Sequence, residues 1–225
     1  MKNNSGNRRD GLPTIPECSP EIIQLHTESP EDNFSYVIHD PVAGELALVD
    51  PGGEGQTILQ CLQRFSQKSL RYILITHSHP DHIAALDSIR KKYSSAVLVA
   101  LCRDLKPDME PAHGELLTFG KSGIRVLRTP GHSSDSLCFY MKDPHCLFSG
   151  DTLFIEDIGF CNGPVMYKTL REIIQQLPED LMVYPGHHYS VLPSDTLKNI
   201  RRKNPFLAAA NRDLNSFLEQ LKYLS

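Results

Sequence analysis

The chain has 225 residues, of which 40% are hydrophobic and 22% charged, and its formal net charge is −4. This length can bury a core without disulfides or a structural metal, and the ordinary composition excludes a fibrous or disordered class. The weak negative charge, without a long basic block, disfavours a nucleic-acid partner, and the absence of any run of 18 apolar residues predicts no membrane span.

The N-terminal residues 1–15 are polar and lack the apolar core of a signal peptide, so they are expected to form a flexible leader. Residues 16–225 are expected to form a single domain that ends in short helices, and a cytoplasmic location is predicted. The six cysteines lack CxxC spacing, which favours reduced thiols, although their even number leaves disulfides open.

Hydrophobic periodicity predicts strands that alternate with helices along most of the chain. The expected strands are 34–39, 45–50, 70–76, 96–101, 115–119, 123–129, 136–142, 145–150 and 181–184. The expected helices are 55–68, 83–93, 166–177 and a C-terminal segment in which Leu214, Phe217, Leu218 and Leu221 share one face. This pattern favours an α/β (α+β) protein with sheets inside and helices outside.

Candidate metal ligands follow four of the expected strands. They are His77, His79, Asp81 and His82 after 70–76, His132 after 123–129, Asp151 after 145–150, and His187 after 181–184. Loops at the ends of strands can meet at one edge of a sheet, where the sheet holds them rigidly. Taken alone, a residue such as His132 is more often packed or solvated than a ligand, but its position together with the motif HxHxDH favours a metal site.

Five histidines and two aspartates are too many ligands for one tetrahedral zinc, and they suit two metals that share a bridging carboxylate. His77 and His79 are two positions apart and project to the same side of an extended segment. Asp81 and His82 come later in the chain, and their side chains can face a second point. Imidazole and carboxylate ligands suit Zn(II), Fe(II) or Mn(II).

The motifs THSHPDH, TPGH, SGDTLF and PGHHY, in this order, resemble those of the metallo-β-lactamase superfamily over about residues 33–207. The resemblance implies an αββα sandwich with a metal site at one edge of the two sheets. It also implies that His77, His79 and His132 bind one metal, that Asp81, His82 and His187 bind the other, and that Asp151 bridges them. Asp50, in LVDPG, matches a family position that supports the ligand loop, although a turn-forming aspartate is an equal alternative.

Within the superfamily, Asp151 resembles the thioester-hydrolase branch, and EDNFSYVI, GDTLF and PGHHY are similar to glyoxalase II (hydroxyacylglutathione hydrolase). Hydrolases associated with polyketide biosynthesis form another similar group. The resemblance implies two divalent metal ions, with zinc preferred over iron or manganese, and a metal-bound hydroxide that cleaves an acyl thioester of glutathione, coenzyme A or an acyl carrier protein. Asp81 is the candidate catalytic residue because it can orient this hydroxide as well as bind metal.

Several features depart from the glutathione-using branches. The segment IEDIGFCNG at 155–163 lacks the arginine of their Gly-Cys-Gly-Arg motif, and only 38 residues follow His187 (225 − 187). Both features disfavour glutathione as the thiol. His188 replaces a common carboxylate and Asp135 replaces a common small residue, and the sequence leaves the roles of both open.

Two alternatives remain at this stage. A mononuclear iron persulfide dioxygenase resembles this chain, particularly around KNPFL, and would use His77, His132 and Asp151. A non-catalytic metal-binding protein is the other alternative. A basic cluster at 201–203 is either a phosphate site for a coenzyme A or phosphopantetheine arm, or a solvated helix end, and the latter is favoured.

Overall fold

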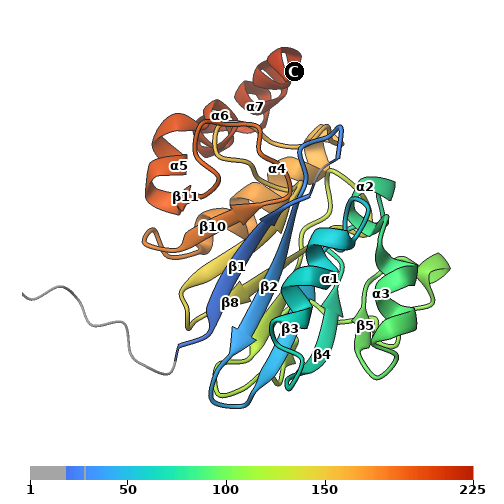
Figure 1. Cartoon of the computed structure of the whole chain (residues 1–225). Coiled ribbons are helices and arrows are strands. Elements are labelled where there is room, and N and C mark those ends of the chain that lie inside the picture. The colour runs from blue at the N-terminus through green and yellow to red at the C-terminus, as the bar shows by residue number, and fades with distance from the viewer. Residues whose placement is uncertain (1–18, 28, 225) are drawn as a thin grey trace, which may run out of the picture.

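The computed structural model describes residues 19–27 and 29–224, so the leader expected at 1–15 lies outside the described residues. The described strands form two sheets, one with the order β1-β2-β3-β4-β5 and one with the order β11-β10-β9-β8-β7-β6 (Figure 1). The first sheet contains β1 (Glu21–His26), β2 (Phe34–Asp40), β3 (Glu45–Val49), β4 (Ser69–Leu74) and β5 (Val97–Val99). The second contains β6 (Leu116–Leu117), β7 (Ile124–Arg128), β8 (Leu137–Met141), β9 (Cys146–Gly150), β10 (Met182–Pro185) and β11 (Asp195–Thr196).

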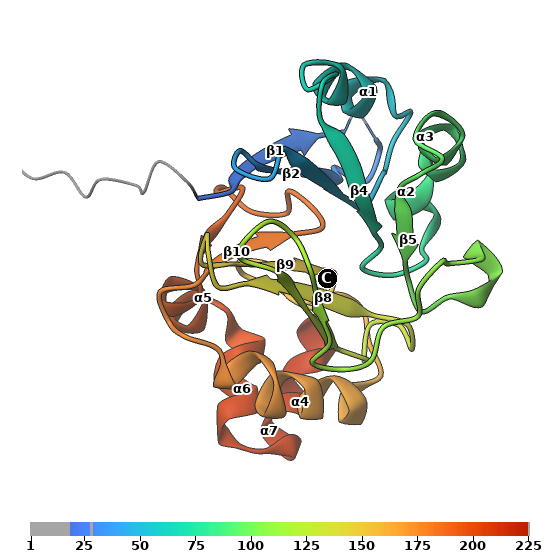
Figure 2. The same ribbon diagram turned by 90° about the horizontal axis from the view of Figure 1, so that it is seen from below.

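Helices cover the outer faces of both sheets. The α-helices are α1 (Gln56–Gln63), α2 (Pro80–Ile83), α3 (Leu86–Lys92), α4 (Gly163–Glu172), α5 (Leu197–Lys203), α6 (Pro205–Arg212) and α7 (Leu214–Gln220), and the 3-10 turns are Arg103–Leu105, Ile174–Gln176 and Leu221–Tyr223. Figure 2 shows α1 and α3 on one side of the stacked sheets and α4 to α7 on the other. The order of layers is helix, sheet, sheet, helix, which confirms the predicted αββα sandwich.

Alternation along the strands produces three hydrophobic layers. On β2, Tyr36 and Ile38 point between the sheets, where they join Phe139 and Phe148 of the second sheet. Val37, between them, points the other way into the layer that α1 and α3 cover. A third layer lies under α4 to α7. Both faces of each sheet are therefore buried, which explains the nearly continuous apolar strands of the sequence.

The helix expected at 83–93 is interrupted. The Ala85 N–H donates to the carbonyl of Pro51 at 2.9 Å and not to a carbonyl of the preceding turn. This long-range hydrogen bond separates α2 from α3, and the hydrophobic periodicity of the sequence does not indicate it. The helix expected at 55–68 ends at Gln63, after which the chain continues in tighter turns such as Arg64 N–H to Cys61 O.

Two strands were not predicted. β1 pairs antiparallel with β2, but it is an edge strand whose residues are all half-buried or exposed, so no clear alternation marks it. β11 has only two residues. In the described part of the chain no helix is long and apolar enough to cross a membrane, and the five described cysteines are unpaired.

Strand directions bring the ligand-bearing loops to one edge. β9 and β10 are parallel, and β7 runs in the same direction because both β7 and β9 are antiparallel to β8. The C-terminal ends of β7, β9 and β10 therefore lie together. The Leu137 N–H donates to Thr76 O at 2.7 Å and so joins the end of β4, in the other sheet, to the same edge.

Candidate metal centre

The structure brings all seven predicted ligands to this edge. Their ligating atoms form three overlapping groups, in each of which the atoms lie within 4.8 Å of one another: His77, His79 and His132; His77, His82 and Asp151; and Asp81, His82 and His187. We call the set His77, His79 and His132 the first triad, and the set Asp81, His82 and His187 the second triad. Both triads come from segments that follow strands, as the sequence predicted, although Asp81 and His82 lie in the short helix α2 and not in a loop.

Backbone carbonyls orient two of the imidazoles. His132 Nδ1 lies 2.8 Å from Phe160 O, and His187 Nδ1 lies 2.6 Å from Glu31 O. Because a carbonyl oxygen only accepts, each Nδ1 must carry the hydrogen. In the neutral rings the Nε2 atoms then present bare lone pairs to the centre, which is the state that binds a metal.

Asp50 orients the other two rings that present Nε2. Its Oδ2 accepts from Thr76 Oγ1 at 2.6 Å and faces His82 Nδ1 at 2.9 Å. Having donated to Asp50, the Thr76 hydroxyl can accept the Nδ1 hydrogen of His77, 3.1 Å away. Asp50 Oδ1 also accepts from the Thr76 N–H at 2.7 Å. Asp50 thus has the contacts of a residue that supports the ligand loop, while its left-handed backbone (φ 47) also makes the turn into Pro51.

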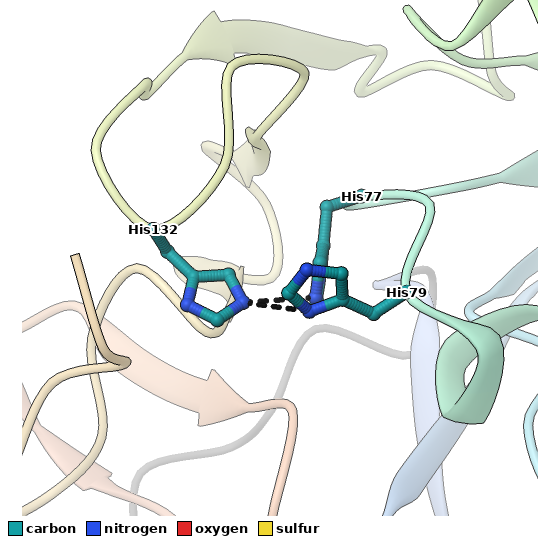
Figure 3. A group of neighbouring side chains, drawn as sticks. All are labelled: His77, His79 and His132. Atoms are coloured by element: carbon teal, nitrogen blue, oxygen red, sulfur yellow. Dashed lines mark hydrogen bonds between the residues drawn. The ribbon is translucent and has the colours of Figure 1, made fainter. Parts of the chain in front are cut away.

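The first triad has the spacing of a metal site (Figure 3). His132 Nε2 lies 3.2 Å from His77 Nε2 and 3.0 Å from His79 Nδ1. Lone pairs at this separation repel unless a proton or a cation lies between them. A tetrahedral ion about 2.05 Å from each nitrogen would hold the nitrogens about 3.3 Å apart, so the spacing fits.

The second triad is equally compact. His82 Nε2 and His187 Nε2 are 3.1 Å apart, and Asp81 Oδ2 lies 3.4 Å from each. Asn33 Nδ2 donates to the same Asp81 oxygen at 2.7 Å. Asn33 was not among the predicted site residues, and the signal for it in the sequence was its place in the segment EDNFSYVI.

Asp151 lies between the two triads. Its Oδ2 is 3.2 Å from His187 Nε2, 3.6 Å from His132 Nε2 and 3.9 Å from His77 Nε2, whereas its Oδ1 is 3.3 Å from His82 Nε2. Oδ1 is buried and has no hydrogen-bond partner among the described residues. A buried carboxylate oxygen without a donor is costly unless a cation compensates it, so the residues present fit a pair of metal ions.

The electrostatics of the cluster favour added positive charge. Burial, together with His82, lowers the pKa of His77 to about 2, so that this ring is neutral. Burial alone would lower the pKa of His82, but the Asp151 and Asp50 carboxylates raise it well above its usual value. For Asp151, burial would raise the pKa, yet His82 and His187 hold it well below the usual range. The carboxylate is therefore ionised, and divalent ions would supply the charge that protons otherwise provide.

Asp135 connects the two loops of the first triad. Its Oδ2 accepts from the Ser78 N–H at 3.0 Å, and Ser78 lies between the two histidines of HSH. Its Oδ1 accepts from Ser133 Oγ at 2.7 Å, and Ser133 directly follows His132. One carboxylate thus fixes the segments that carry all three nitrogens of the first triad.

We expect Asp135→Ala to weaken binding at the first triad by about 10- to 100-fold, because ligand orientation is lost while every ligand remains. Asp135→Asn, which keeps one acceptor oxygen, should lose less. Competition titration with a chromophoric chelator measures both affinities, and Asp104→Ala, which removes an exposed carboxylate from the 103–105 turn, is the control. Wild-type affinity in Asp135→Ala would show that the contact has no positioning role.

His188 does not join the cluster. The His188 ring packs against Phe34 and His26, with ring centroids 5.2 and 5.8 Å away, and the backbone N–H of His188 donates to Asp32 O at 2.9 Å. Its contacts are those of a surface residue that anchors the loop after β10.

Gly186 allows the close approach of the loop that carries His187. A Cβ at this position would lie 2.4 Å from Asp151 Oδ1 and 2.7 Å from His82 Cε1. We therefore expect Gly186→Ala to displace both side chains and to lose at least one metal equivalent, measured by elemental analysis, while circular dichroism still shows a folded protein. The control is Gly114→Ala, whose methyl would meet nothing within 4 Å. Its left-handed φ of 82 should cost about 1 kcal/mol of stability without loss of metal. Full metal content in Gly186→Ala would contradict this prediction.

Comparison with known proteins agrees with this geometry. The model of the metallo-β-lactamase superfamily matches residues 29–187. A hydroxyacylglutathione hydrolase of Rhodopseudomonas palustris is 34% identical over 184 residues, which cover 79% of this chain and 71% of that enzyme. The chain belongs to the metallo-β-lactamase superfamily, and it is an enzyme of that superfamily.

Two solved structures are also similar. ETHE1 from Myxococcus xanthus superposes with a TM-score of 0.77 at 26% identity, covering 90% of both chains. TTHA1623, solved in a di-iron-bound form, gives a TM-score of 0.67 at 26% identity and covers 83% of this chain and 99% of the other.

Proposed function

We propose that the protein is a dinuclear metallohydrolase that cleaves acyl thioesters. The observation that carries the proposal is the position of the Asp151 carboxylate, between two triads whose ligating atoms converge. The first triad would hold one ion, the second triad the other, and Asp151 both. This leaves positions for water and substrate, as in catalytic rather than structural sites.

When bound, the two ions would lower the pKa of a shared water toward neutrality and polarise the thioester carbonyl. Asp81 is the proposed catalytic residue. Its carboxylate faces the centre, is held by Asn33, and is placed to orient the attacking water. A C–O bond forms, the C–S bond breaks, and the products are a carboxylate and a thiol, which leaves readily because thiolates are weakly basic.

The thioester assignment is supported by relatives named hydroxyacylglutathione hydrolase, and two ions are supported by the di-iron form of TTHA1623. Zinc is the ion we propose first, with iron or manganese as alternatives. Two of the three residues of the basic cluster at 201–203 already have partners. Arg201 donates to the carbonyls of Gln175 and Leu177, and Lys203 pairs with Asp195. Glutathione, coenzyme A and acyl carrier protein, including a carrier of polyketide biosynthesis, remain the thiols to test.

The persulfide dioxygenase alternative needs only His77, His132 and Asp151, and it assigns no task to the second triad. A non-catalytic metal-binding protein would have no use for the coordination positions that the proposed ligands leave open to water and substrate. Both therefore rank below hydrolysis.

The test combines metal analysis of protein purified without chelator with thiol release from lactoylglutathione, acetyl-coenzyme A and an acetylated carrier protein. We expect about two metal equivalents, thiol release without oxygen uptake, and loss of activity in His79→Ala, which removes a first-triad ligand. One iron per chain with oxygen uptake on glutathione persulfide would replace this proposal with the dioxygenase. Full metal content without either activity would favour the non-catalytic protein.

A further inference from the structure

The segment KNPFL places a buried asparagine, Asn204, between α5 and α6, and the proposed function gives this residue no task. Asn204 is 1% exposed. Its Oδ1 accepts from the N–H groups of Phe206 and Leu207, each at 3.0 Å, and so caps the first turn of α6. Its Nδ2 donates to the carbonyls of Phe154 at 3.3 Å and Asp157 at 2.8 Å. All four hydrogen-bonding positions of the amide are therefore used.

The two carbonyls lie in the segment 152–160, which connects the proposed bridging ligand Asp151 to the group that orients His132. That group is the carbonyl of Phe160, 2.8 Å from His132 Nδ1. The Gly159 N–H donates back to Asp151 O at 3.0 Å, and a Cβ on Gly159 would lie 2.5 Å from His132 Nδ1. A small shift of this segment would therefore move one of the ligand rings of the first triad.

The same segment contains no helix or strand, so its position depends on contacts with other parts of the chain. Leu153, Ile155 and Ile158 are buried in the same hydrophobic layer as Phe206. Hydrophobic packing is non-directional, so it can keep the segment folded without fixing where its carbonyls point. The two hydrogen bonds from Asn204 are directional, and they tie the segment to the start of α6.

The second triad depends on other supports. His187 Nδ1 faces the carbonyl of Glu31, and His82 Nδ1 faces the carboxylate of Asp50. Neither partner lies in the segment that Asn204 holds. A change at Asn204 should therefore affect the two triads unequally.

We propose that Asn204 is a positioning residue of the first triad, because it holds the segment 152–160 so that the Phe160 carbonyl keeps His132 directed toward the metal. This inference rests on the proposed metal-dependent function and adds a control of the same site from the helical layer. The amide would couple the helices on the outer face of the second sheet to the metal centre (Figure 2).

Asn204→Asp separates the two roles of this residue, because an aspartate also caps α6 but presents no amide donor to the two carbonyls. Competition titration of the metal-free full chain with zinc and a chromophoric chelator measures the affinity of each triad. His79→Ala identifies the binding step that belongs to the first triad. We expect Asn204→Asp to weaken this step about tenfold and to change the other step by less than about twofold.

A second measurement needs no metal. Imidazole ¹H–¹⁵N NMR spectra of the metal-free chain report which ring nitrogen of each histidine carries the hydrogen. In the wild type, His132 should carry it on Nδ1, where the Phe160 carbonyl accepts it. In Asn204→Asp, His132 should show a mixture of both tautomers, whereas His187 should keep its hydrogen on Nδ1.

Asp213→Ala is the matched control, because it removes the cap of α7, where the Asp213 carboxylate accepts from the N–H and the hydroxyl of Ser216. It should lower Tm without changing either metal affinity. Asn204→Ser, which also keeps a capping oxygen, repeats the test if the aspartate variant does not fold.

Unchanged affinity of the first triad in a folded Asn204 variant, or an equal loss at both triads, would show that Asn204 acts only in folding and would overturn the inference. Fewer than two zinc equivalents in the wild type would instead overturn the proposed dinuclear function. The tautomers of His132 would still decide whether Asn204 positions this ring.

Discussion

Replacing Asp151 with alanine should release metal from both triads and lower the proposed thioesterase activity by roughly a thousandfold, about 4 kcal/mol of transition-state stabilisation. The reason is geometric, because its two oxygens lie 3.2 to 3.9 Å from four histidine nitrogens that belong to both triads. Elemental analysis should show a fall from two equivalents, and steady-state kinetics should show the loss of activity.

Asp151→Asn separates charge from shape, since the amide keeps the volume but not the anionic oxygens. It should also lose metal, although less completely. Asp180→Ala is the matched control, because that carboxylate also lies near a histidine, His145 at 3.4 Å, but is 81% exposed. Two full metal equivalents in Asp151→Ala would contradict the bridging role.

Asp50→Ala should have the second largest effect, although Asp50 is not a proposed ligand. Its buried carboxylate interacts with the Thr76 N–H, the Thr76 hydroxyl and His82 Nδ1. Without it, buried donors lose their acceptor, and His77 loses the chain of hydrogen bonds that fixes its tautomer. We expect a loss of about 3 kcal/mol in the free energy of unfolding, roughly 10 °C in Tm, and a 10- to 100-fold lower metal affinity.

Asp50→Asn distinguishes the two roles of this residue. Asparagine tolerates the left-handed φ of 47, so the turn should survive. Its amide replaces one acceptor oxygen by a donor, so ring orientation and metal affinity should still suffer. If Asp50→Asn and Asp50→Ala both bind metal as the wild type does, Asp50 acts only in the turn.

The sequence by itself determined the α/β class and the residue types of the proposed ligands, and the resemblance of its motifs to the metallo-β-lactamase superfamily predicted the sandwich. Two-residue periodicity in the strands and the placement of histidines and aspartates after them are local properties of the chain. His77 and His79 share a side of an extended segment whatever surrounds them. The position of His132 and His187 at strand ends was equally visible, and the fold places both beside Asp151.

Only the tertiary structure decided how these ligands are held. His132 Nδ1 faces the carbonyl of Phe160, 28 residues away, and His187 Nδ1 faces that of Glu31, 156 residues away. A backbone carbonyl is the same at every residue, so no pattern of side chains can reveal such a partner. For the same reason, the sequence could not predict the hydrogen bond from the Ala85 N–H to the Pro51 carbonyl, which divides α2 from α3. Asp135 likewise became interpretable only when loops distant in the chain lay at one edge of the sheets.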